Sequence, residues 1–264
     1  MMTGAEAEPP SVAAGPPTVA AGSPTVVAGP HSVAAGPLRG APGPHSVAAG
    51  PPSVADDASM LAGLVHRHAT DTGKSRLIVG ITGGPGSGKS SLAAQLADQL
   101  SIGGEGSVVV PMDGFHLAQS VLAALQLTEV KGAPQTFDGD GYVALIRRLR
   151  AVEDRTVYAP TFKRDIEEPV AGAIAVPAGV RYVITEGNYL LLDSEPWVQL
   201  RAELDAIWFL EPPEDIRVNR LVRRHIQFGR TPNQALRRAT SGSDADNAAL
   251  IASTRQRADL IITI

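Results

Sequence analysis

The residues best suited to chemistry form one stretch, Gly83 to Ser90, which reads GGPGSGKS and fits the phosphate-binding template GxxxxGK[ST]. Glycines let a loop aim several backbone N–H groups at a phosphate without a Cβ clash. The lysine adds a positive charge at the outer phosphates, and the hydroxyl of the next serine can bind Mg²⁺. We therefore predict a triphosphate and Mg²⁺ site; the alternative is a turn that only caps a helix. The residues predicted to bind nucleotide here are Gly83, Gly84, Pro85, Gly86, Ser87, Gly88, Lys89, Ser90 and Ser91.

Two acidic residues directly follow apolar runs that read as buried strands. Asp113 follows residues 107–112, and Glu186 follows residues 180–185. In open α/β sheets, ligands bind beyond the carboxyl ends of the strands, so both acids should face the triphosphate. Asp113 is the candidate base that takes the proton from a hydroxyl group receiving the phosphate, and Glu186 is the candidate that assists Mg²⁺. The alternatives are that Asp113 caps the next helix and that Glu186 is structural.

The elements needed to position these residues can be read from the apolar pattern. Strands are expected at 76–82, 107–112, 180–185, 205–210 and 259–264, with helices between them. The class is therefore α/β: a three-layer P-loop NTPase fold with a five-stranded parallel sheet. The segment 157–176 contains prolines that disfavour a central strand, so it is expected to be a small edge structure or lid over the pocket for the phosphate acceptor.

Composition divides the chain into two parts. Residues 1–56 repeat a seven-residue unit such as SVAAGPP, and Gly and Pro in such units predict a disordered low-complexity tail. Residues 57–264 hold the P-loop domain. Cys is absent, which excludes a thiolate metal site, and the net charge of −4 does not suggest nucleic acid as a partner. No long apolar run suggests a membrane segment, so we expect a cytoplasmic protein.

A basic helix is predicted near residues 214–226. At 100° per residue, Val218, Leu221, Val222 and Ile226 share one face, and Arg217, Arg220, Arg223 and Arg224 share the other. We expect the apolar face to dock on the core. The arginine face is either ordinary solvated surface or part of a hinged lid that closes over the phosphates before Gly229-Arg230.

With these motifs in order, the chain resembles the phosphoribulokinase and uridine kinase family, together with the bacterial pantothenate kinases, over residues 58–264. The matching motifs after the P-loop are MDGFH at 112–116, YAP at 158–160, EGNYL at 186–190 and RRH at 223–225. The resemblance implies that Asp113 is the catalytic base, that Glu186 assists Mg²⁺ and that Arg223 acts on the phosphates with Arg220 and Arg230. It also implies that the acceptor pocket is lined by Phe115, His116, Asp138, Tyr158 and Arg164.

The chain departs from the uridine kinases at three places. His225 stands where they carry Asp, the lid is a residue shorter before Gly229, and the segment 131–138 differs. These departures leave the acceptor open among nucleosides, sugars and pantothenate-like molecules.

The predicted function is ATP-dependent phosphorylation of a hydroxyl group on a small metabolite, with ATP and Mg²⁺ as cofactors. A nucleotide-binding regulator without catalysis is an alternative. A GTPase-type switch is disfavoured because the sequence contains no NKxD guanine-reading motif.

Overall fold

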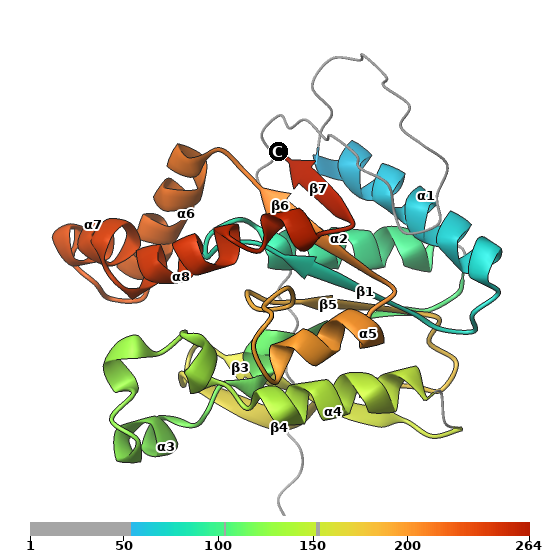
Figure 1. Ribbon diagram of the computed structural model, residues 1–264, viewed down its shortest axis with the longest axis horizontal. Coiled ribbons are helices and arrows are strands. Elements are labelled where there is room, and N and C mark those ends of the chain that lie inside the picture. Colours follow the sequence, from blue (N-terminus) through green and yellow to red (C-terminus); the bar gives the residue numbers. More distant parts are fainter. Residues whose placement is uncertain (1–53, 103, 152–153) are drawn as a thin grey trace, which may run out of the picture.

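The computed structural model describes residues 54–102, 104–151 and 154–264, and its centre is a five-stranded sheet (Figure 1). The strands stand in the order β2-β5-β1-β6-β7, and every neighbouring pair is parallel. The five predicted strands are confirmed to within about two residues at each end. Their bounds are β1 Leu77–Thr82, β2 Ser107–Pro111, β5 Tyr182–Glu186, β6 Ala206–Glu211 and β7 Leu260–Thr263.

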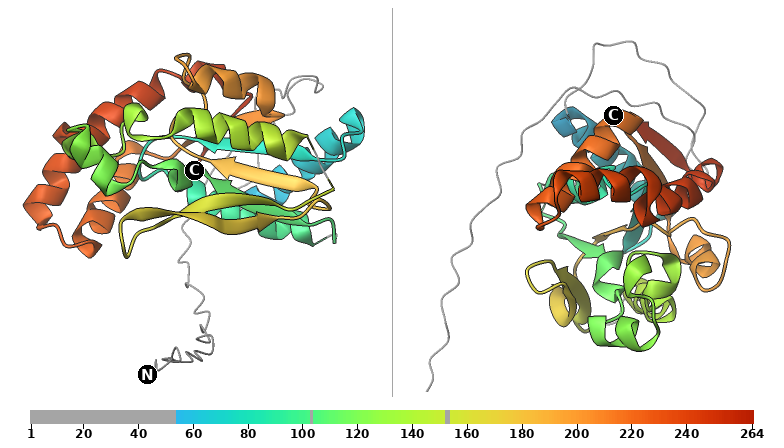
Figure 2. Two further views of the ribbon diagram at one scale, coloured as in Figure 1. Left: turned by 90° about the horizontal axis from the view of Figure 1, so that it is seen from below. Right: turned by 90° about the vertical axis from the view of Figure 1, so that its left-hand side faces the viewer.

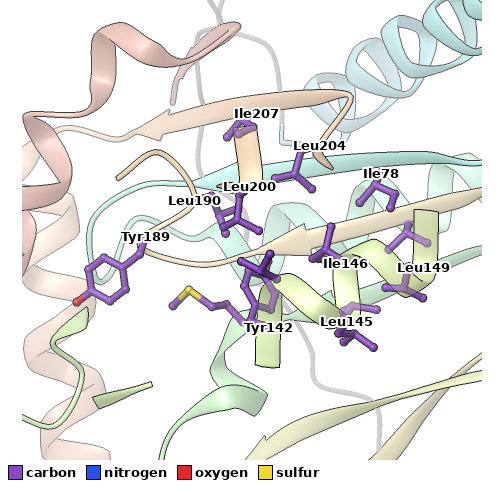
Figure 3. Packing of buried hydrophobic residues seen from close by; sticks show 14 of the residues in the cluster. Ile78, Tyr142, Leu145, Ile146, Leu149, Tyr189, Leu190, Leu200, Leu204 and Ile207 are labelled. Carbon is purple, nitrogen blue, oxygen red and sulfur yellow. The ribbon is translucent and has the colours of Figure 1, made fainter. Parts of the chain in front are cut away.

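Helices cover both faces of this sheet, which explains why β1 and β5 are buried along their whole lengths. On one face, α1 and α2 bring Leu61, Leu96 and Leu100 against Tyr182 and Trp208. On the other face, α4 and α5 pack against the sheet (Figure 3). The predicted three-layer α/β fold is therefore confirmed. The bounds are α1 Val54–Thr72, α2 Lys89–Ser101, α3 Gln119–Ala124, α4 Gly139–Arg150 and α5 Leu200–Glu203.

The second face has the larger aromatic content. Tyr142, Leu145, Ile146 and Leu149 project from one side of α4 toward the sheet, a spacing typical of an amphipathic helix (Figure 3). The Tyr142 hydroxyl is paired with that of Thr185 on β5, so its polar atom is satisfied inside the core.

The segment with the prolines forms its own antiparallel hairpin beside the main sheet, as expected. Strands β3 (Val157–Lys163) and β4 (Glu168–Val176) form a separate two-stranded sheet. Their connecting turn, residues 164–167, reaches the cleft described below. The hairpin therefore forms one wall of that cleft.

Three helices are grouped at the carboxyl ends of the strands: α6 (Glu214–Gln227), α7 (Pro232–Ser241) and α8 (Ser243–Ala252) (Figures 1 and 2). The predicted division of α6 into an apolar inner face and a basic outer face is wrong. Arg217 is only 6% exposed, whereas Ile226 is 41% exposed. The inner face is centred on Leu221, and helical spacing places Arg217 and Arg224 on the same stripe.

The disordered repeat tail is predicted for residues 1–56, and residues 1–53 of it lie outside the described residues. Helix α1 begins at Val54, so it starts before the predicted domain boundary at residue 57. Within the described residues, no helix combines the length and the apolar character needed to span a bilayer.

Arg76 directly precedes β1, at the end of the sheet away from α6, α7 and α8. Its side chain links the segments around it, and we expect it to be a major source of stability. Its buried guanidinium donates hydrogen bonds to the carbonyl oxygens of Val180, Leu149, Pro177 and Ala178 at 2.8–3.0 Å. Arg76→Met leaves these acceptors unsatisfied, so the free energy of unfolding should fall by about 3 kcal/mol in urea denaturation.

The matched control is Arg67→Met on the exposed side of α1, which should change the same free energy by no more than about 0.5 kcal/mol. Equal losses in the two variants would contradict the role given to Arg76.

Candidate active site

The loop between β1 and α2 is folded as a phosphate-binding loop. Gly86 has φ of +84°, and a Cβ there would lie 2.6 Å from the carbonyl oxygen of Arg217 on α6. A Cβ on Gly83 would lie 2.5 Å from the carbonyl oxygen of Leu210 on β6. Because neighbouring backbone approaches this closely, glycine is required at both positions. The loop is thus fixed by β6 and α6 as well as by its own sequence.

Lys89 is the first residue of α2, and it is 8% exposed. Its ammonium group donates hydrogen bonds to the carbonyl oxygens of Gly83, at 2.8 Å, and Gly84, at 3.2 Å. Burial lowers the pKa of Lys89 to about 8, although nearby Glu186 and Asp113 act in the opposite direction. The cation is therefore held inside the loop without a contacting carboxylate among the described residues, where an anionic ligand would stabilise it.

Ser90 and Glu186, the two predicted metal ligands, lie together. The Ser90 hydroxyl donates a hydrogen bond of 2.9 Å to Oε1 of Glu186. Burial, and then the charge of Asp113, raise the pKa of Glu186 above its usual range. A hydroxyl and a carboxylate are hard oxygen donors that suit Mg²⁺. The described residues contain no group of three or more His, Cys, Asp or Glu side chains that could hold a metal alone, and Mg²⁺ in such sites commonly shares its ligands with substrate phosphates.

The P-loop opens into a cleft of about 1130 Å³. Lys89, Ser90, Glu186 and Asp113 all line it, so the predicted nucleotide, metal and base residues are brought to one place. Asp113 lies in the short helix η1 (Met112–Phe115) that follows β2. Its Oδ2 accepts a hydrogen bond of 3.0 Å from Arg164 on the hairpin turn, and both side chains are partly exposed to the cleft.

Part of the cleft wall consists of the side-chain rings of His116, Phe137 and Phe162. His116 lies with its ring centroid 4.0 Å from that of Phe137 and 4.8 Å from that of Phe162. Its Nδ1 is 2.8 Å from the carbonyl oxygen of Asp113, which can only accept, so Nδ1 carries the proton. Burial lowers the pKa of His116, which favours the neutral ring. Neutral His116 therefore retains an unprotonated Nε2 that can accept a hydrogen bond.

The arginines of α6 are distributed differently from the sequence prediction. Arg224 lines the cleft, whereas Arg223 is exposed and does not line it. Burial lowers the pKa of Arg224, and neighbouring Arg164 lowers it further. Arg220 Nη1 donates to the carbonyl oxygen of Ser87 at 3.2 Å, and exposed Arg230 lines the cleft beyond the end of the helix.

Three of the five predicted acceptor residues do not line the cleft. Phe115 packs edge-on against Tyr142 beneath it. Asp138 caps α4 by accepting a hydrogen bond of 2.9 Å from the backbone of Gly141. Tyr158 is 59% exposed because strand alternation turns it away from its buried neighbours Val157 and Ala159. His116 and Arg164 remain as the predicted residues on the acceptor side.

Two residues have roles that the sequence analysis did not assign: Lys131 in the cleft and Arg217 behind the P-loop. Lys131 donates to Gln119 and Glu167, and it lies 5.1 Å from the ring centroid of Phe162. Arg217 Nη1 donates to the carbonyl oxygen of Pro85 at 2.8 Å, which secures the P-loop from behind. Arg217 and Arg224 could have been found from their spacing around Leu221. Lys131 lies in irregular structure, and no periodic signal indicates it.

Comparison with known proteins also indicates a kinase. The family model described as phosphoribulokinase / uridine kinase matches residues 78–264. A Schizosaccharomyces pombe protein named "Putative uridine kinase C227.14" is 34% identical over 71% of this chain and 83% of its own length. Escherichia coli YggC is 35% identical over 71% of this chain and 77% of its own length.

Solved structures agree with the sequence matches. A Silicibacter structure described as a "putative fructose transport system kinase" superposes with a TM-score of 0.71 at 38% identity, covering 77% of this chain and 98% of that one. Strand order, P-loop and sequence match therefore lead to one conclusion: the chain belongs to the phosphoribulokinase / uridine kinase family of small-molecule kinases.

Proposed function

We propose that this protein transfers the γ-phosphoryl group of ATP to a hydroxyl group of a small metabolite, with Asp113 as the general base. The observation that carries this proposal is the convergence of Lys89, Asp113 and Arg224 on one cleft. Phosphoryl transfer needs cations beside the phosphates and a base beside the acceptor hydroxyl. The P-loop and α6 each supply a cation, and a carboxylate in the same cleft supplies the base.

The base step follows from the position of Asp113 at the end of β2. The acceptor hydroxyl takes the place of Arg164 beside the carboxylate, gives its proton to Asp113, and its oxygen forms the new bond to the γ-phosphorus. The bond from phosphorus to the β,γ-bridging oxygen breaks, and ADP leaves. Arg164 is partly exposed, so it can turn away from Asp113 at little cost, since such ion pairs contribute only about 0–1 kcal/mol.

The remaining groups stabilise charge. With ATP bound, Lys89 would contact the β- and γ-phosphates, and Arg224 would contact the oxygens of the transferring group. Ser90 and Glu186 would hold Mg²⁺ or its water ligands, and the ion, when bound, neutralises phosphate charge. The α6 arginines otherwise serve the loop: Arg217 and Arg220 contact P-loop carbonyl oxygens and hold its shape.

The residues on the acceptor side of the cleft suit a small polar molecule that also has an unsaturated or apolar face. Phe137, Phe162 and His116 supply rings, and Nε2 of His116 supplies a hydrogen-bond acceptor. Lys131 already contacts Gln119 and Glu167, so it offers little to an anionic acceptor. Nucleosides and sugars are therefore the first acceptor classes to test, and the names of two relatives, a uridine kinase and a fructose transport system kinase, point to the same classes.

The test is acceptor-dependent release of ADP in the presence of MgATP, measured with uridine, cytidine, pantothenate, fructose, glycerate and ribulose 5-phosphate. We expect at least one acceptor to stimulate release. Asp113→Asn should abolish that stimulation and leave ATP binding largely intact, because the amide cannot take the proton. Lys89→Ala is the negative control.

Two outcomes would count against the proposal. ATP binding without stimulation by any acceptor would favour a nucleotide-binding regulator. Near-normal turnover by Asp113→Asn would remove Asp113 as the base.

Arg224 and Arg223 form a matched pair for the phosphate contact. Arg224→Ala should lower kcat by about 10³-fold or more, the usual contribution of an arginine that stabilises the transferring phosphoryl group. Arg223→Ala should leave kcat near that of the wild type, because Arg223 is exposed and does not line the cleft. Steady-state kinetics with the acceptor found above would measure both, and a larger loss in Arg223→Ala would reverse the assignment.

Nucleotide binding should be linked to the protonation of Lys89. With a pKa of about 8, Lys89 is about half neutral at pH 8 in the free protein, and a bound triphosphate raises that pKa. Binding of a non-hydrolysable ATP analogue should therefore take up protons at pH 8 to 9, and affinity should fall as pH rises above 8.

Calorimetry in buffers of different ionisation enthalpy measures this uptake. Lys89→Arg is the control, since an arginine stays charged in this range and should show none. Equal proton uptake by the wild type and Lys89→Arg would mean that another group titrates.

A further inference from the structure

Asp244 is a buried acid at the start of α8, and it joins the three helices that cover the cleft. It is 8% exposed and lines the cleft together with Arg224 and His225. Its Oδ2 lies 2.6 Å from Nε2 of His225 on α6 and 3.5 Å from Nε of Arg238 on α7. One carboxylate on α8 therefore contacts both of the other helices.

A simpler role for Asp244 would be to stabilise its own helix. An acid in the first turn of a helix contributes up to about 2 kcal/mol through the helix dipole. Asp246 occupies the same first turn and can do this from the exposed side of α8. Burying a carboxylate is costly unless it is paired, so the contacts with His225 and Arg238 are what keep Asp244 in its position.

His225 directly follows Arg224 in α6. Neighbouring residues of a helix lie 100° apart, so a contact that fixes His225 also fixes the rotation of the helix and the direction of Arg224. Within the described part of the chain, Arg224 has no ion-pair partner of its own. Its place in the cleft is therefore set by the helix that carries it.

The same face of α8 also contacts the acceptor side. Asn247, three residues after Asp244, donates a hydrogen bond of 3.2 Å to the carbonyl oxygen of Gly132. Arg238 of neighbouring α7 donates to the carbonyl oxygen of Lys131 at 3.3 Å. The Tyr189 hydroxyl also donates to the Gly132 carbonyl oxygen, which ties this loop to the core. Helix α8 is thus anchored to a fixed part of the cleft wall. Through Asp244 it can therefore hold α6 in a fixed position.

We propose that Asp244, acting through His225, is a positioning residue that holds Arg224 in the cleft for phosphoryl transfer. The proposal rests on the proposed function, because it assigns Arg224 to the transferring phosphate.

The test is a double-mutant cycle on the full chain. Asp244→Ala should lower kcat by about 10²-fold, the scale of a small misplacement of a catalytic group. In the Arg224→Ala background it should cause no further loss, because residues that act as a unit are not additive. Asp246→Ala is the matched control in the same helical turn, and its kcat should stay near that of the wild type.

A rescue experiment separates positioning from loss of fold. His225→Asp combined with Asp244→His restores the pair in reverse, and it should recover at least tenfold in kcat over either single change. If Asp244→Ala does not fold, Asp244→Asn keeps the shape and takes its place in the cycle. Without an acceptor, the ratio of the Kd for ADP to the Kd for a β,γ-imido analogue of ATP gives a second readout. This ratio should fall in both Asp244→Ala and Arg224→Ala, and further in Arg224→Ala.

Additive losses in the cycle, or a kcat for Asp244→Ala within threefold of the wild type, would overturn the inference and leave the proposed function intact. Failure of the wild type to phosphorylate any acceptor would instead overturn the proposed function, while the ratio of nucleotide affinities would still test the link from Asp244 to Arg224.

Discussion

The buried ammonium group of Lys89 is the constraint on which the rest of the site depends. The loop encloses it, it donates hydrogen bonds to two carbonyl oxygens of that loop, and no carboxylate contacts it in the described residues. A buried cation of this kind is costly, as its lowered pKa indicates, and a bound triphosphate removes that cost. The free protein therefore favours binding of an anion beside Lys89, and the surrounding elements hold the loop in the shape that allows it.

Helix α6 contributes to this site at two positions along its length. Near its start, Arg217 donates to the carbonyl oxygen of Pro85 and supports the P-loop from outside the cleft. Two turns later, Arg224 enters the cleft from the same stripe of the helix. One rotation of α6 thus determines both the shape of the loop and the position of a phosphate-facing cation. This explains why the helix is held at both ends, by the P-loop at Pro85 and Gly86 and by α8 at Asp244.

The fold and the donor half of the site could be predicted from the sequence because their signals are local. Continuous apolar runs identified β1, β2, β5, β6 and β7, and the position of Asp113 and Glu186 after such runs placed both in the cleft. The acceptor half could not be predicted as well. Tyr158 is turned outward by strand alternation, and Asp138 is used as a helix cap, so a motif alone misplaced both. Lys131 has its place in the cleft through contacts with segments far from it in the sequence, and Asp244 through the packing of α8 on α6 and α7.

The central claim is that Asp113 activates the acceptor hydroxyl against the phosphate held by the P-loop. A crystal structure with MgADP, a fluoroaluminate group and an acceptor that the protein phosphorylates tests it most directly. We predict that the acceptor hydroxyl lies within hydrogen-bond distance of Asp113, that Arg164 has left that carboxylate, and that Arg224 contacts the fluoroaluminate. An acceptor bound away from Asp113, with the pair between Asp113 and Arg164 still intact, would contradict it.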